Sequence, residues 1–157
     1  YLVRNGIKEA NMEETLNVVN TLLVDTFNNI LTIEQNALKK EKIFDVSVAE
    51  VHTIEAIGMY QTKSMSEVAK NLQITVGTLT VAINNLVKKG YVERFRCQSD
   101  KRVVLIKLTK KGKLLYRVHE QFHRNVVKAT ISGLTKQERE VLCQTLIKLN
   151  VYLQKYF

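Results

Sequence analysis

The residues with the clearest chemistry are basic side chains that gather in one short segment, residues 86–117. Its eleven lysines and arginines are Lys88, Lys89, Arg94, Arg96, Lys101, Arg102, Lys107, Lys110, Lys111, Lys113 and Arg117. Against two acidic residues, Glu93 and Asp100, they give this segment a charge of +9, which is the net charge of the whole chain. Such a charge suits a polyanion, because lysines and arginines that neutralise phosphates release condensed counterions. Charge alone leaves a merely solvated basic face as the alternative.

A second group, His119, Glu120 and His123, spells the H-E-x-x-H pattern of zinc proteases. Histidines four residues apart on a helix share a face and can bind Zn²⁺, while the glutamate activates water. A protease also needs a third ligand and a substrate cleft, and Phe122 here continues an apolar helix face. We therefore predict no metal and no cofactor, and keep a regulatory zinc site at His119 and His123 as an alternative.

The rest of the sequence offers no serine–histidine–acid set, catalytic carboxylate pair or phosphate-binding glycine loop, so we predict that the protein is not an enzyme. Cys97 and Cys143 match no disulfide or metal spacing, which predicts buried or inert thiols. Of the 157 residues, 45% are hydrophobic and 25% charged, as is typical of a globular protein. With no membrane-length apolar run and no secretory signal, we expect a cytoplasmic protein without membrane contact.

Helices must position these side chains, and periodicity and caps indicate where they lie. Apolar residues recur every three to four positions from Leu16 towards Leu38, which predicts a long amphipathic helix. Three S/T-x-x-E capping boxes, at residues 47–50, 64–67 and 135–138, predict the starts of further helices. Residues 1–11 show neither a cap nor a period, and we interpret them as an expression remnant or a loose extension.

The basic segment itself overlaps a predicted helix, a hairpin and the start of another helix. After a tight turn at Gln73 and Ile74, Thr75 is a natural N-cap, and Gly90 ends the helix that follows. The inner face of this helix is predicted to be Val76, Leu79, Ile83 and Leu86. The β-prone runs 91–96 and 103–108 flank a polar tip and predict two strands; Thr109 then caps a helix that Gly133 interrupts.

The order short helix, turn, helix, hairpin with a basic tip is the plan of a winged helix-turn-helix, and predicts a mainly helical DNA-binding fold with a small β-hairpin. Threonine and valine methyls can touch thymine, asparagine can pair with adenine, and an arginine at the hairpin tip can enter the minor groove, held there by Asp100. The residues expected to contact DNA are Thr75, Gly77, Thr78, Val81, Asn84, Asn85, Lys88, Arg96, Lys101 and Arg102. An ordinary amphipathic helix would share the helical part of this pattern.

Successive motifs from Met12 to the carboxyl end resemble those of MarR-type repressors. They are Ser66-Glu67-Val68-Ala69, residues 74–86, residues 88–94, Ser99-Asp100-Lys101-Arg102 and residues 108–112. Within that family, residues 51–54, 75–80, 84–86 and 102–104 are most similar to regulators of type II fatty-acid synthesis genes. The resemblance implies an obligate dimer that represses these genes, with a long-chain acyl-acyl carrier protein as corepressor. Many family members carry a basic residue where Val81 stands, which leaves the base preference open.

The expected organisation is one MarR-like domain over residues 12–157. Residues 47–109 form the winged helix-turn-helix, and residues 12–46 and 110–157 form dimerisation helices whose apolar faces are too broad for one chain to cover. A two-fold dimer predicts a near-palindromic operator in double-stranded DNA. An RNA- or protein-binding winged module, or a regulator that responds to another small ligand, is the alternative.

An acyl effector would need an apolar space between the dimerisation helices and the helix that begins after Ser47. The residues predicted to line this space are Phe27, Ile30, Leu31, His52, Ile54 and Leu115. Ordinary core packing is the alternative for each of them.

Overall fold

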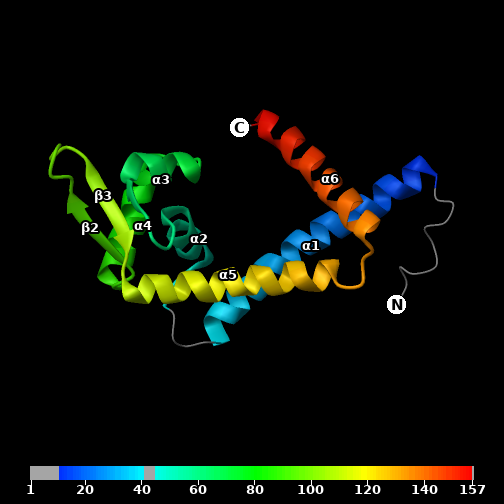
Figure 1. The fold of residues 1–157 in the computed structure, drawn as a ribbon, viewed down its shortest axis with the longest axis horizontal. Helices are drawn as coiled ribbons and strands as arrows, with labels where there is room; N and C mark the ends of the chain where they lie inside the picture. The colour runs from blue at the N-terminus through cyan, green and yellow to red at the C-terminus, as the bar shows by residue number, and fades with distance from the viewer. Residues whose placement is uncertain (1–10, 41–44, 157) are drawn as a thin grey trace. The chain divides into compact units, whose positions relative to one another are not determined.

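The computed structural model describes residues 11–40 and 45–156, and Figure 1 labels its helices and strands. The chain divides into two compact units within its fifth helix, between Tyr116 and Arg117. Of the amino-terminal stretch interpreted as a remnant or extension, residues 1–10 lie outside the described residues.

The elements follow the predicted order. The first unit contains α1 (Met12–Lys40), α2 (Val48–Ile57), β1 (Thr62–Ser64), α3 (Met65–Asn71), α4 (Val76–Lys88), β2 (Val92–Arg96), β3 (Val104–Leu108) and the start of α5 (Lys110–Ile131). The second unit contains the rest of α5, α6 (Lys136–Leu153) and the 3₁₀ helix η1 (Gln154–Tyr156). The predicted mainly helical chain with a small hairpin is confirmed. None of the described helices has the length and hydropathy that a membrane span requires.

Side-chain caps begin three helices where the sequence predicts them. In each, the cap hydroxyl accepts a hydrogen bond from the backbone N–H three residues later, and the glutamate there accepts one from the cap N–H. The pairs are Ser47–Glu50, Ser64–Glu67 and Thr135–Glu138. The prediction that no cap precedes residue 12 is wrong: Asn11 Oδ1 accepts from Glu14 N at 2.9 Å, and Glu14 Oε2 accepts from Asn11 N at 3.2 Å.

The turn between α3 and α4 is tight, as predicted. Gln73 takes the left-handed conformation with φ of 55°, which costs a residue with a Cβ some free energy. A hydrogen bond of 3.0 Å from Ile74 N to Ala69 O closes the turn. Thr75 Oγ1 then accepts a hydrogen bond from Thr78 N at 3.1 Å, and α4 begins there. The two helices of the motif are thereby fixed by local hydrogen bonds.

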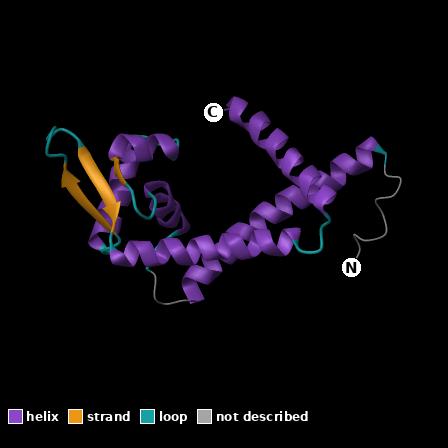
Figure 2. Ribbon diagram, in the orientation of Figure 1, coloured by secondary structure: helices purple, strands orange, loops and turns teal. Residues whose placement is uncertain are grey.

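The sheet has three antiparallel strands in the order β1-β3-β2 (Figure 2). In the predicted hairpin, Val92 pairs with Leu108 and Arg96 pairs with Val104. The sequence analysis missed β1, which pairs Thr62 with Lys107 on the other side of β3. A three-residue strand is too short to show a period, and its partner lies far along the chain.

The core of the first unit is assembled from α2, α3, α4, the sheet and the start of α5. Its fully buried side chains include Val51, Ile54, Ile57, Val68, Leu79, Ile83, Leu86, Tyr91, Ile106 and Leu115. The placement of Val76 on the inner face of α4 is wrong, because this first residue of the helix is 45% exposed. The other three predicted inner residues are buried, so the opposite face of α4 is turned outward.

The start of α5 is held closely against the end of α4. Thr109 Oγ1 donates to Gly90 O at 2.7 Å, and Thr109 N donates to Tyr91 O at 3.0 Å. A Cβ at Gly112 would overlap the carbonyl oxygen of Tyr91, so only glycine permits this approach. These contacts hold the first residues of α5 next to Gly90 and Tyr91, where α4 ends and the hairpin begins.

Candidate nucleic-acid interface

The outer face of α4 is exposed as predicted. Its exposed members are Gly77, Thr78, Val81, Asn84, Asn85 and Lys88. Val81 is 63% exposed in the middle of this face, where its methyls have no protein core to contact. The first turn of α4 holds no acidic side chain, so nothing there opposes the positive end of the helix dipole. The face combines apolar methyls, amides and one lysine in a form that suits a DNA groove.

Thr75 has a structural task besides any contact with DNA. Its hydroxyl oxygen lies 2.9 Å from that of Thr78 while it caps α4. The cap fixes where the first turn of α4 begins, so Thr75 sets the position of Thr78 on the exposed face.

The wing formed by β2, β3 and their connection presents Arg96, Lys101 and Arg102 to solvent. A backbone hydrogen bond of 3.0 Å from Val103 N to Asp100 O closes the tip of the wing. The prediction that Asp100 grips an arginine side chain is not what the structure shows: Asp100 Oδ1 accepts from the backbone N–H of Arg102 at 2.9 Å. The aspartate therefore shapes the turn that carries Arg102.

Some of the basic residues in segment 86–117 hold the fold together. Lys89 Nζ contacts both carboxylate oxygens of Glu50, at 2.8 and 2.9 Å, and Lys107 pairs with Glu93 across the hairpin at 3.0 Å. Lys111 Nζ lies 3.6 Å from Asp45 Oδ1. These three lysines already have carboxylate partners, so the charge available for phosphates is smaller than the sequence count.

Lys111 and Asp45 meet Tyr91 in a polar cluster at the base of α5. The Tyr91 hydroxyl donates to Asp45 Oδ1 at 2.9 Å, and Lys111 Nζ lies 4.1 Å from the centre of the Tyr91 ring. Burial, then the hydrogen bond to Asp45, raises the pKa of Tyr91 to about 12. The same hydrogen bond lowers the pKa of Asp45. The cluster joins the segment before α2 to β2 and α5.

The residue not predicted from the sequence is Arg94, which links the wing to α4. Arg94 Nη1 on β2 donates to Asn84 Oδ1 on α4 at 2.8 Å. No helical or strand spacing relates these two positions, so the sequence offered no signal for the pair beyond the basic character of the hairpin.

The predicted effector residues are dispersed in the first unit. Ile54 and Leu115 are fully buried in the core, whereas Phe27 and Leu31 are 58% and 46% exposed and Ile30 is half-buried. His52 Nε2 lies 3.8 Å from Glu34 Oε2. Whether these residues bind an effector stays a prediction.

A separate groove of about 870 Å³ lies between α2, the α3–α4 turn and α4. It is lined by Ser47, Ala49, Glu50, His52, Thr53, Leu72, Ile74, Thr78, Val81, Ala82, Asn85 and Lys89. Of the predicted effector residues it includes only His52. Because it also includes Thr78, Val81 and Asn85, an occupant would touch the exposed face of α4.

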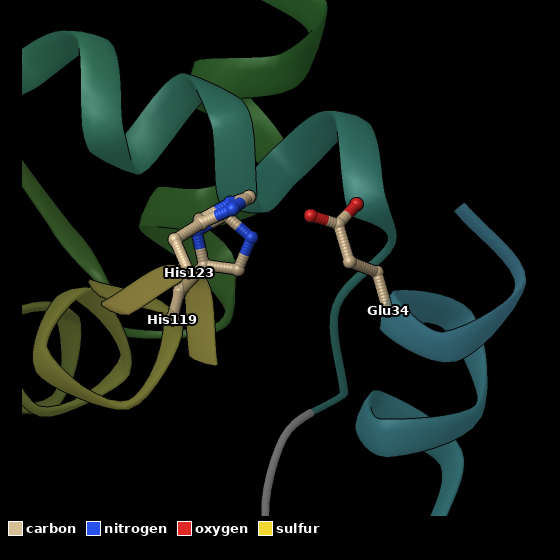
Figure 3. Close-up of side chains that lie close together, drawn as sticks. All are labelled: Glu34, His119 and His123. Atoms are coloured by element: carbon tan, nitrogen blue, oxygen red, sulfur yellow. The ribbon is translucent and has the colours of Figure 1, made fainter. Parts of the chain in front are cut away.

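His119 and His123 lie next to each other on α5, with ring centroids 4.4 Å apart and rings nearly perpendicular (Figure 3). α5 itself thus supplies two imidazoles, as the H-E-x-x-H spacing predicts, while tetrahedral zinc needs further ligands. The regulatory zinc alternative stays untested.

The cysteines are both free thiols and neither is buried, so of the predicted buried or inert thiols only the inert alternative stays a prediction. Cys143 is exposed and Cys97 is half-buried near the wing tip. Cys97 Sγ lies 3.1 Å from Ser99 Oγ, and this hydrogen bond lowers the pKa of the Cys97 thiol.

Comparison with known proteins places this chain among DNA-binding transcription regulators. The family model described as transcriptional regulator SarA/Rot matches residues 35–118. The crystal structure of Streptococcus pneumoniae FabT in complex with DNA superposes with a TM-score of 0.84 and 39% identity, covering 90% of this chain and 99% of that one.

Two curated relatives agree with these matches. The HTH-type transcriptional regulator BilQ of Clostridium symbiosum is 30% identical over 139 residues, which are 88% of this chain and 92% of BilQ. The multiple antibiotic resistance protein MarR of Escherichia coli is 32% identical over 123 residues, 71% of this chain and 83% of MarR. The chain spans 56% to 92% of the length of five curated relatives that it matches.

Proposed function

The chain belongs to the family of MarR-type transcriptional regulators, and from that premise we propose that it represses type II fatty-acid synthesis genes as a homodimer on duplex DNA. Its relatives are transcription regulators, so it is a DNA-binding regulator and not an enzyme. The observation that carries the proposal is the 39% identity, over 90% of the chain, to FabT crystallised with DNA. The resemblance of residues 51–54 and 75–80 to regulators of fatty-acid synthesis supports the choice of genes.

A second copy of the chain is the expected partner of the exposed apolar faces. One side of α1 exposes Leu16, Val19, Leu23, Phe27 and Leu31, and α6 exposes Val141, Leu146, Ile147, Val151 and Leu153. No described residue of α6 is buried. Apolar surface of this extent favours association, and a two-fold pair of α4 helices would read a near-palindromic site.

The proposed corepressor is a long-chain acyl-acyl carrier protein. Its acyl chain would need an apolar site, for which residues Phe27, Ile30, Leu31, His52, Ile54 and Leu115 remain the candidates. The two that are fully buried, Ile54 and Leu115, would have to move apart to admit a chain.

The test is a titration of the protein with a near-palindromic duplex from a fatty-acid synthesis promoter and with a scrambled duplex of equal composition. We expect a preference of about 1000-fold for the palindrome, and tighter binding when long-chain acyl-acyl carrier protein replaces the unacylated form. Equal affinity for both duplexes, with a steep salt dependence, would indicate only polyanion binding and contradict the proposal.

The groove between α2 and α4 favours a second candidate, a regulator of the same family that responds to another small ligand. An occupant would touch Thr78, Val81 and Asn85, and so would compete with DNA for the face of α4. In the same titration, insensitivity to acyl-acyl carrier protein together with specific DNA binding would favour this candidate.

A further inference from the structure

Arg94 connects the wing to the reading helix through one hydrogen bond. Its Nη1 donates to Asn84 Oδ1 at 2.8 Å, and both residues are exposed on the first unit. The backbone of Arg94 is held in the sheet, where it pairs with Ile106, a fully buried residue of β3. Asn84 lies between the buried Ile83 and Leu86 on α4, so its backbone is also fixed. The two side chains therefore meet from rigid elements.

The chemistry of the pair determines which end of the asparagine amide is free. A guanidinium has five N–H donors and no acceptor, so only the amide oxygen of Asn84 can face it. The amide –NH₂ group, with two donors, is then left for other partners. Because a hydrogen bond to a charged donor is the stronger kind, the guanidinium holds the amide in this orientation.

This orientation changes what Asn84 can read. An asparagine that pairs with adenine uses its oxygen to accept from N6 and its nitrogen to donate to N7. The oxygen of Asn84 keeps a second lone pair, but the guanidinium bonded to it brings further N–H donors and a positive charge to the same place. Together with the free –NH₂ group, it makes the pair match a base edge that only accepts. In the major groove the purine with two adjacent acceptors, O6 and N7, is guanine.

Resting on the proposed use of α4 as the reading helix, we infer that Arg94 is a positioning residue that directs Asn84 to read guanine instead of adenine. Arg94 acts through Asn84 and sets the base preference at one position of each half-site. Loss of Arg94 frees Asn84 Oδ1, and the preference at that position moves towards adenine.

The experiment selects bound duplexes from a randomised library with the full chain and with Arg94→Ala, Arg94→Lys and Asn84→Ala. Arg96→Ala is the matched control, because it removes the same charge two residues along β2. We expect the unmodified chain to enrich guanine at one position per half-site, and Arg94→Ala to lower that enrichment about tenfold or shift it to adenine. Arg94→Lys keeps a donor for Asn84 Oδ1 and restores part of the enrichment.

The pair is also tested as a unit. Asn84→Ala should abolish the preference at the same position, and adding Arg94→Ala to it should change base preference no further. Arg96→Ala should weaken binding to all sequences by a similar factor. The inference is overturned if Arg94→Ala behaves like Arg96→Ala, if the unmodified chain enriches adenine there, or if Asn84→Ala leaves that position unchanged. Absence of any enriched sequence, or enrichment of one foreign to fatty-acid synthesis promoters, would instead count against the proposed function.

Discussion

Helices α4 and α6 both carry many apolar residues, but they use them differently. Within the first unit, α4 buries Leu79, Ile83 and Leu86 completely. In the second unit, α6 buries none of its described side chains, and Leu146 and Ile147 are 53% and 61% exposed. The chain itself buries the apolar face of α4, but it buries none of the described side chains of α6.

This difference separates the two tasks of the regulator. Because the inner face of α4 is fixed by the core, its outer face has a defined orientation and can present Thr78 and Asn84 to DNA. The apolar side chains of α6 have no such core and gain most from contact with a second copy. The proposed reading of DNA thus depends on the folded winged unit alone, whereas the proposed pairing depends on surfaces that one copy leaves exposed.

The largest effect is expected from a change on the inner face of α4. Leu79→Ala removes a fully buried side chain and should lower the free energy of unfolding by about 3 kcal/mol. Val81→Ala, on the same helix but 63% exposed, is the control and should change it by less than about 0.5 kcal/mol. Urea unfolding monitored by circular dichroism measures both. Equal losses in the two variants would contradict the assignment of the inner and outer faces.

A charge on α6 should break association without breaking the fold. Ile147 is an apolar residue of α6 that is 61% exposed. Ile147→Glu should weaken dimerisation about 100-fold, because the new carboxylate must be desolvated in the interface. Gln144→Glu adds the same charge at another exposed position and should have little effect. Sedimentation equilibrium gives the dissociation constants. A monomeric unmodified chain, or a dimer that tolerates Ile147→Glu, would show that α6 does not mediate pairing.

A smaller change is expected at the wing. Arg102→Ala should weaken binding to every operator sequence about tenfold and reduce the salt slope by about one, since it removes one phosphate-neutralising or minor-groove charge. Thr78→Ala should alter the preferred base and leave the salt slope unchanged. Lys128→Ala, on α5, removes an equal charge outside the wing as the control. Anisotropy titrations at several salt concentrations separate the three, and no change with Arg102→Ala would remove the wing from the interface.

Much of the fold could be predicted because its signals are local. Capping boxes such as Ser47 with Glu50 mark helix starts within four residues, and the burial of Leu79, Ile83 and Leu86 follows from their spacing. What the sequence did not reveal depends on pairing between distant residues. The strand β1 forms because Thr62–Ser64 pairs with β3, more than forty positions later in the sequence. A pattern of three residues cannot predict such a pairing.

The site was predictable to the same extent. The exposed face of α4 follows from helical geometry once the inner face is known. Which basic residues are free to bind DNA and which pair within the protein does not follow from helical geometry. Lys89 pairs with Glu50, and Arg94 with Asn84, through contacts that only the folded chain creates. Counting charges along the sequence therefore points to a candidate interface but overestimates how many of its lysines are available to DNA.

The smallest effect concerns the polar cluster of Tyr91, Asp45 and Lys111 at the base of α5 in the first unit. The pKa of Tyr91 is raised from 10.0 to about 12, so between these pH values the folded chain keeps a proton that the unfolded chain has lost, and stability falls as pH rises. The lowered pKa of Asp45 acts at the other end, where stability is lost as pH falls below about 4. Tyr91→Phe should flatten both slopes relative to Tyr60→Phe, which changes a tyrosine that is 76% exposed. Urea midpoints measured from pH 3 to pH 11 test this, and parallel profiles for the two variants would mean that the Tyr91–Asp45 hydrogen bond contributes nothing to the pH dependence of stability.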